Sequence, residues 1–222
     1  VLFRSFSSLD VKNLRVLLID SVLSGNQQLG EGQDWRAVFN KLAIAPLETV
    51  RISDSRFEFH NLDYKKPVQM IFDSVNISVI NINNTEKVAK ELPSFLNFSA
   101  RLQRDAWVRG NARFSLLHPT PSFNLNFNLS ALDLQRLNNF FLLYGPYYFR
   151  SGDLTSYTQL NLHERELRGS LTVFLKDIEA IRIPWNNQVS PGFLRDTVGA
   201  FGDIALRRPQ RSEEHTSELQ SH

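Results

Sequence analysis

Apolar and polar residues alternate one by one along most of this chain. The clearest run is 123–130, FNLNFNLS, in which phenylalanine and leucine occupy the odd positions while asparagine and serine occupy the even ones. A period of two is typical of a β-strand that buries one face and leaves the other in water. The sequence therefore predicts a fold built from amphipathic strands.

The same alternation recurs through the chain, and turn-forming residues separate most of the runs. The expected strands are 14–20, 49–61, 68–82, 96–103, 108–116, 123–130, 153–163 and 167–176. Short connections favour antiparallel pairing of sequence neighbours, and the lack of continuous Val/Ile runs disfavours a parallel sheet covered on both faces. We expect a mainly β fold, in which amphipathic antiparallel strands form either a curled sheet with an apolar groove or a closed β-sandwich.

Four segments instead carry the three-to-four-residue spacing of short amphipathic helices. They are 34–42, 85–92, 133–143 and 192–206. Asp34, Thr85 and Asp133 are suitable N-caps for the first three. The longest apolar run, 140–144, is far shorter than the roughly 20 residues that span a bilayer. We therefore expect a few short helices beside the sheet and no membrane-spanning helix in this segment.

Composition narrows the possible classes of protein. With 222 residues, of which 42% are hydrophobic, the chain can bury a core and is not intrinsically disordered. The absence of cysteine excludes thiolate metal sites and cysteine nucleophiles. A formal net charge of +2 is too small for the electrostatic footprint of a nucleic-acid-binding protein, so no nucleic-acid partner is expected.

Both ends of the chain resemble foreign sequence. Residues 1–5 (VLFRS) and 211–222 (RSEEHTSELQSH) resemble translations, from opposite strands, of one common sequencing adapter. Two matches to one oligonucleotide at opposite ends are hard to obtain by chance. We therefore expect residues 6–210 to be a β-rich fragment of a larger protein, and any targeting or anchoring segment of that protein to lie outside this chain.

No constellation of residues favours catalysis. Glu164 and Glu166 flank an arginine at an expected hairpin tip, where a solvated turn explains them better than acid–base chemistry. The string HEREL at His163 lacks the second histidine of the H-E-x-x-H zinc motif, and His60 and His118 are far from it in sequence. We expect no enzymatic activity, no cofactor and no metal.

Aromatic residues gather between positions 140 and 149. They could form a platform for a lipid or a carbohydrate, or they could pack a helix against the sheet, and packing is the favoured interpretation. Tyr147 and Tyr148 are adjacent, so in a strand they would face opposite ways, which disfavours a flat sugar-binding surface.

A spaced pattern of turns and strands covers residues 132–169. It consists of a Leu-Asp-Leu step at 132–134, a short helix that ends near Tyr144, the sequence SGDL at 151–154 and a closing LRG at 167–169. Upstream, residues 46–61 (PLETVRISDSRFEFHN) carry a strand with the pattern I-x-x-S-x-F-x-F-x-N. Together these motifs resemble the AsmA-like envelope proteins of Gram-negative bacteria, in the branch called domain-of-unknown-function family 748. The resemblance spans most of 49–175, and the segment 183–206 departs from the acidic, leucine-rich helical stretch of that branch.

The resemblance implies a β-rich trough from a membrane-anchored protein of the periplasm and cell envelope. Such a protein would carry phospholipid between the inner and outer membranes, or contribute to outer-membrane biogenesis, without catalysis. Burial of an acyl chain contributes about 0.8 kcal/mol per CH₂ group, so an apolar sheet face is a suitable surface for it. The expected groove residues are Phe98, Leu102, Phe114, Leu116, Phe123, Leu125, Phe127, Leu129, Leu171 and Val173. The alternative is a closed β-sandwich that serves as a binding or adhesion module of the envelope.

Overall fold

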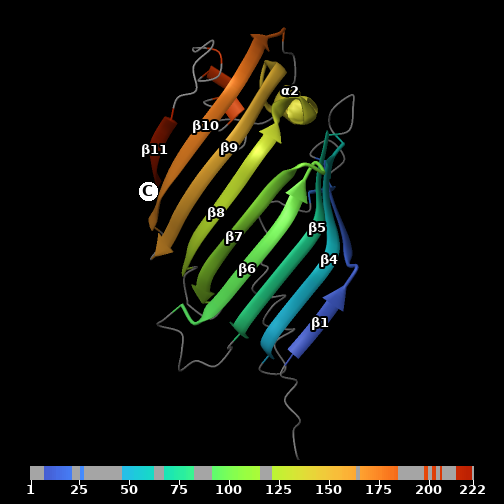
Figure 1. Cartoon of the computed structure of the whole chain (residues 1–222), viewed down its shortest axis with the longest axis vertical. Coiled ribbons are helices and arrows are strands. Elements are labelled where there is room, and N and C mark those ends of the chain that lie inside the picture. The colour runs from blue at the N-terminus through green and yellow to red at the C-terminus, as the bar shows by residue number, and fades with distance from the viewer. Residues whose placement is uncertain are drawn as a thin grey trace, which may run out of the picture.

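The computed structural model describes residues 8–21, 26–27, 47–62, 68–82, 92–115, 122–163, 166–184, 198–199, 202–203, 206 and 214–221. Across these ranges eleven strands form one open, curled sheet, with short helical segments beside it (Figure 1). The strands are β1 (Ser8–Lys12), β2 (Arg15–Ser21), β3 (Asn26–Gln27), β4 (Leu47–Asn61), β5 (Val68–Ile82), β6 (Ser94–Leu102), β7 (Ala106–Ser115), β8 (Ser122–Asp133), β9 (Tyr147–His163), β10 (Glu166–Arg182) and β11 (Glu214–Ser221). The mainly β fold predicted from alternation is confirmed.

The order of strands follows the order of the chain over most of the sheet. It is β11-β10-β9-β8-β7-β6-β5-β4-β2-β3, and each pair from β4 to β10 is antiparallel. Each of the predicted strands is present. Since all of the described strands belong to a single sheet, the structure does not favour the closed sandwich.

The amino-terminal edge differs from the expected antiparallel arrangement. Both β1 and β2 run parallel to β4, one after the other along its outer edge. At the junction between them, the backbone N–H of Leu14 donates to the Ser55 hydroxyl at 3.0 Å, and the N–H of Arg56 donates to the Leu14 carbonyl at 2.8 Å. At the opposite edge, β11 pairs with Leu167–Phe174 of β10, and it lies within the segment expected to be foreign.

Alternation sorts the side chains of the sheet onto two faces. On one, here called the apolar face, a row of residues in register crosses from β4 to β10. The row is Ile52, Ile77, Phe98, Gly110, Phe127, Thr158 and Leu171. The residues on either side of that row point to the opposite face, here called the polar face, and are mostly asparagine, serine and arginine.

Four strands each contain a β-bulge at a residue with positive φ. The bulge residues are Asp54 in β4, Ser74 in β5, Ala131 in β8 and Asp177 in β10, with φ values of 51°, 51°, 48° and 50°. A bulge places one extra residue in one strand and bends it locally. The bulges lie along one line across the sheet, beside Gly152 of β9, whose φ is 136°.

Two short helices cover one half of the apolar face. The 3₁₀ helix η2 (Leu134–Leu137) and the helix α2 (Asn138–Tyr144) pack against β9 and β5. Asp133 caps η2 by accepting a hydrogen bond from the Gln135 N–H at 2.9 Å, as predicted. The Asn138 amide exchanges two hydrogen bonds of 2.8 Å with the backbone of Phe149, which fixes α2 on β9.

The hydrophobic core lies beneath these helices. The largest fully buried side chains there are those of Leu132, Leu134, Leu143, Tyr147 and Phe149. Tyr147 is 2% exposed and Tyr148 38% exposed, so the two tyrosines face opposite ways. The aromatic cluster therefore serves mainly to pack the core.

The structure describes only part of the other segments that were predicted to be helical. Segments 34–42 and 85–91 lie outside them, whereas Val198, Gly199, Gly202, Asp203 and Leu206 are helical. Val198 packs against the core, and the Tyr147 hydroxyl lies 2.8 Å from an Asp203 carboxylate oxygen. Among the helices in these ranges, none has the length and hydropathy needed to cross a membrane.

Candidate functional site

The candidate site is the half of the apolar face that η2 and α2 leave uncovered, on the other side of the line of bulges. No described helix and no second sheet packs on this uncovered half. It contains the row from Ile52 to Leu171 and a second row in register beside it, made up of Val50, Val79, Leu96, Ala112, Leu125, Leu160 and Gly169. Two rows across seven strands give a continuous apolar surface.

The structure describes nine of the ten expected groove residues, and register and alternation place all nine on the apolar face. Leu116 lies outside the described ranges. Leu102 and Leu129 are 5% and 8% exposed and belong to the packed core, so they support the surface rather than line it. The other seven, which are half-buried or slightly exposed, are Phe98, Phe114, Phe123, Leu125, Phe127, Leu171 and Val173.

Further residues extend this surface beyond the expected set. Ile52, Ile77 and Leu96 continue it across β4, β5 and β6, and Leu160 continues it on β9. The same period of two marks these positions in the sequence, so the signal was present there as well.

Two glycines let large side chains lie flat on the uncovered half. A Cβ atom at Gly110 would come within 2.5 Å of both the Phe98 ring and the Asn126 carbonyl oxygen, so the ring occupies the space above Gly110. At Gly169, the Leu160 side chain would be 2.7 Å from such an atom. Each glycine lets a neighbour from the next strand lie across it and close the surface.

One polar atom interrupts the apolar row. Thr158 stands between Phe127 and Leu171, and its hydroxyl oxygen is buried without a hydrogen-bond partner among the described residues. A buried hydroxyl is stabilised when it finds an acceptor or a donor. The Thr158 hydroxyl is therefore a buried polar group that the described residues leave unsatisfied, and it is closed to a molecule lying on the surface.

The titratable groups form their main cluster elsewhere, near the far end of β4 on the polar face. Glu58 accepts from Arg56 at 2.6 Å and lies 3.0 Å from His60, and Arg56 also contacts Asp73 at 2.7 Å. The hydrogen bonds from Arg56 and His60 hold the pKa of Glu58 below its usual value. These groups neutralise one another, which is the behaviour of an ion-pair network that stabilises the fold.

Of the residues considered for catalytic or metal chemistry, His163 and Glu166 are register partners at the β9–β10 hairpin and His60 lies in β4, while Glu164 and His118 lie outside the described ranges. Glu166 pairs with Arg168 at 2.7 Å at the start of β10, and His163 ends β9. Among the described residues no group of three or more histidine, aspartate or glutamate side chains is placed to hold a metal ion.

Comparison with known proteins finds no relative of this chain. No family model matches the chain, and no curated protein and no solved structure matches it either. The functional argument therefore depends on the uncovered apolar half and on the resemblance of the sequence motifs.

Proposed function

We propose that the chain is a non-enzymatic segment of an AsmA-like protein of the Gram-negative envelope, and that its uncovered apolar half binds phospholipid acyl chains. The observation that carries the proposal is a continuous apolar surface across seven strands, with no described element over it. A contiguous apolar surface of this kind on a protein marks a place where a partner, a ligand or a membrane binds.

The dimensions and chemistry of the surface suit an acyl chain. Neighbouring strands lie about 4.8 Å apart, so seven strands span roughly 29 Å, close to the thickness of a bilayer's hydrocarbon core. Phenylalanine and leucine side chains offer no hydrogen bonds, and each buried CH₂ group of the lipid would contribute about 0.8 kcal/mol.

The test is to express the full chain in a Gram-negative bacterium, purify it without detergent, extract it and measure phospholipid by mass spectrometry. The variant Leu125→Asp places a charge on the uncovered half, at a position outside the packed core. The matched control is Asn124→Asp, which adds the same charge to the same strand on the polar face. We expect about one phospholipid per chain for the wild type and for Asn124→Asp, and a loss of most of it for Leu125→Asp.

A folded wild-type chain that carries no phospholipid would refute the proposal. Equal retention by Leu125→Asp and Asn124→Asp would refute the assigned surface, because lipid would then be held elsewhere. A lipid-free wild type would support instead the binding or adhesion module that was the alternative expectation.

A further inference from the structure

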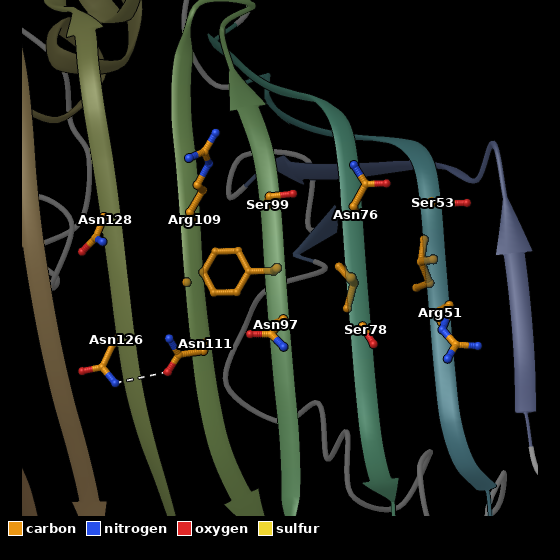
Figure 2. A pocket seen from close by; sticks show the side chains of 14 residues that line it. Arg51, Ser53, Asn76, Ser78, Asn97, Ser99, Arg109, Asn111, Asn126 and Asn128 are labelled. Carbon is orange, nitrogen blue, oxygen red and sulfur yellow. Dashed lines mark hydrogen bonds between the residues drawn. The ribbon is translucent and has the colours of Figure 1, made fainter.

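The polar face carries a depression that the acyl-chain proposal does not use. It has a volume of about 540 Å³ and spans β4 to β8 (Figure 2). Ten polar side chains surround it in two rows that follow the strand register. They are Arg51, Ser78, Asn97, Asn111 and Asn126 in the first row, and Ser53, Asn76, Ser99, Arg109 and Asn128 in the second.

Of the five asparagine side chains around the depression, three bond to described residues and two are left to bind a ligand. Asn126 donates to Asn111 at 3.3 Å, and Asn76 donates to the Ser74 carbonyl at 2.9 Å. The side chains of Asn97 and Asn128 make no hydrogen bond within the described part of the chain, and both are exposed. Each free amide offers two donors and an acceptor.

The charge around the depression is positive. None of the fourteen residues that line it is acidic, and two of them are arginines at its rim, Arg51 directed toward β1 and Arg109 along β7 (Figure 2). Two further arginines, Arg101 and Arg113, stand in the adjoining rows of the same face, where Asp73 is the register partner of Arg101. The nearest balancing contact is an exposed ion pair of 3.7 Å between Arg51 and Asp10, a kind of pair that is weak in water.

Aromatic rings hold the arginines in position. The guanidinium groups of Arg101 and Arg109 lie 4.3 Å and 4.7 Å from the centre of the Trp107 ring. A stacked guanidinium keeps the N–H donors on its edge available for a carboxylate or a phosphate. Because two cations already occupy the Trp107 ring, it is poorly placed to stack a nucleic-acid base.

From these features we propose that the depression binds an acidic oligosaccharide. The anionic groups of the sugar would pair with Arg51 and Arg109, which gives the charge complementarity, and its hydroxyl groups would bond to the rows of asparagine and serine. The rows repeat at the strand spacing of about 4.8 Å, which is comparable to the length of one pyranose unit. A nucleic acid shares the negative charge but lacks this density of hydroxyl groups.

The test is calorimetric titration of the full chain with hexagalacturonate, at low and at physiological salt. The parallel ligands are maltohexaose, which is neutral, and a thymidine oligonucleotide with the same number of charges. The test variant is Arg51→Gln/Arg109→Gln, and the matched control is Arg168→Gln, an exposed arginine on the polar face of β10 outside the depression. Circular dichroism checks that each variant is folded.

We expect the wild type to bind hexagalacturonate at least tenfold more tightly than maltohexaose. The double variant should lose about tenfold or more in affinity and most of the salt dependence, whereas Arg168→Gln should change affinity less than twofold. Absence of hexagalacturonate binding, equal binding of maltohexaose, equal binding by the double variant, or tighter binding of the oligonucleotide would each overturn the proposal. A second variant, Asn97→Ala, should weaken hexagalacturonate binding without changing its salt dependence.

Discussion

Truncation of leucine at two positions of β8 measures how differently the two halves of the apolar face are covered. Leu132 and Leu125 belong to the same strand and point to the same face. Leu132 is 2% exposed beneath η2 and α2, whereas Leu125 is half-buried on the uncovered half. The substitutions Leu132→Ala and Leu125→Ala therefore remove the same atoms from two different surroundings.

The expected magnitudes follow from burial. Leu132 packs within the core cluster, so its truncation leaves a cavity that the helices and β9 close only partly, which costs about 2–5 kcal/mol. Leu125 already contacts water on one side, so its truncation removes roughly half of a leucine transfer energy and leaves no closed cavity. We expect Leu125→Ala to reduce the free energy of unfolding by about 1 kcal/mol.

The assay is urea unfolding of the full chain and the two variants, followed by circular dichroism and by tryptophan fluorescence. The dependence of the free energy on urea concentration should be the same for all three, so that the midpoints report stability alone. Equal losses for the two variants would refute the reasoning, because the uncovered half would then be packed as tightly as the core.

Three further predictions concern individual contacts. In urea unfolding, Gly110→Val should destabilise the fold by roughly 1–3 kcal/mol, because the added Cβ atom would clash with a main-chain oxygen and a phenylalanine ring. The control is Gly199→Ala, whose added Cβ atom would have no other atom within 4 Å. It should change the free energy of unfolding by less than about 1 kcal/mol. Tyr147→Phe should cost about 1 kcal/mol in the same assay, because the hydroxyl donates to the carboxylate 2.8 Å away. Because the pKa of Glu58 is lowered, its pairing with Arg56 stabilises the fold fully at pH values above 4.5, the ordinary pKa of a glutamate. This contribution is lost as the pH falls through the lower pKa that Glu58 has in the folded state. Urea midpoints between about pH 3 and pH 6 should therefore fall less steeply with acid for Glu58→Gln than for the wild type.

Each of these has a contrary outcome. A stable Gly110→Val variant would mean that the two strands can separate there, and equal midpoints for Tyr147→Phe would mean that water replaces the lost bond at no cost. An unchanged acid profile for Glu58→Gln would assign the acid sensitivity to other carboxylates.

Alternation in the sequence was sufficient to predict eight of the eleven described strands and the facing of their side chains, whereas β1, β3 and β11 were not predicted. The predicted run 123–130 lies inside β8, and the predicted helix at 133–143 appears as η2 and α2 with the expected Asp133 cap. These features depend on interactions between residues close in the chain, which a periodic pattern records directly.

Features that depend on distant residues were not predictable in the same way. The parallel pairing of β1 and β2 with β4 is held by backbone hydrogen bonds, including the one from the Arg56 N–H to the Leu14 carbonyl, and a backbone bond leaves no trace in side-chain polarity. The polar depression was overlooked for a related reason. Its asparagine and serine residues look in the sequence like any wet strand face, and only the register brings Asn97, Asn111 and Asn126 into one row.

The line of bulges marks positions where the sheet can lose one residue without reversing its two faces. In β4 the apolar face receives even-numbered residues before Asp54, such as Ile52, and odd-numbered residues after it, such as Phe57. Removal of Asp54 alone would leave Ile52 and Phe57 four residues apart, so both would still lie on the apolar face and only the local bend would be lost. Natural variants of this sheet should therefore tolerate the loss of one residue at a bulge better than the loss of one residue elsewhere in a strand, which turns the side chains on one side of the deletion over.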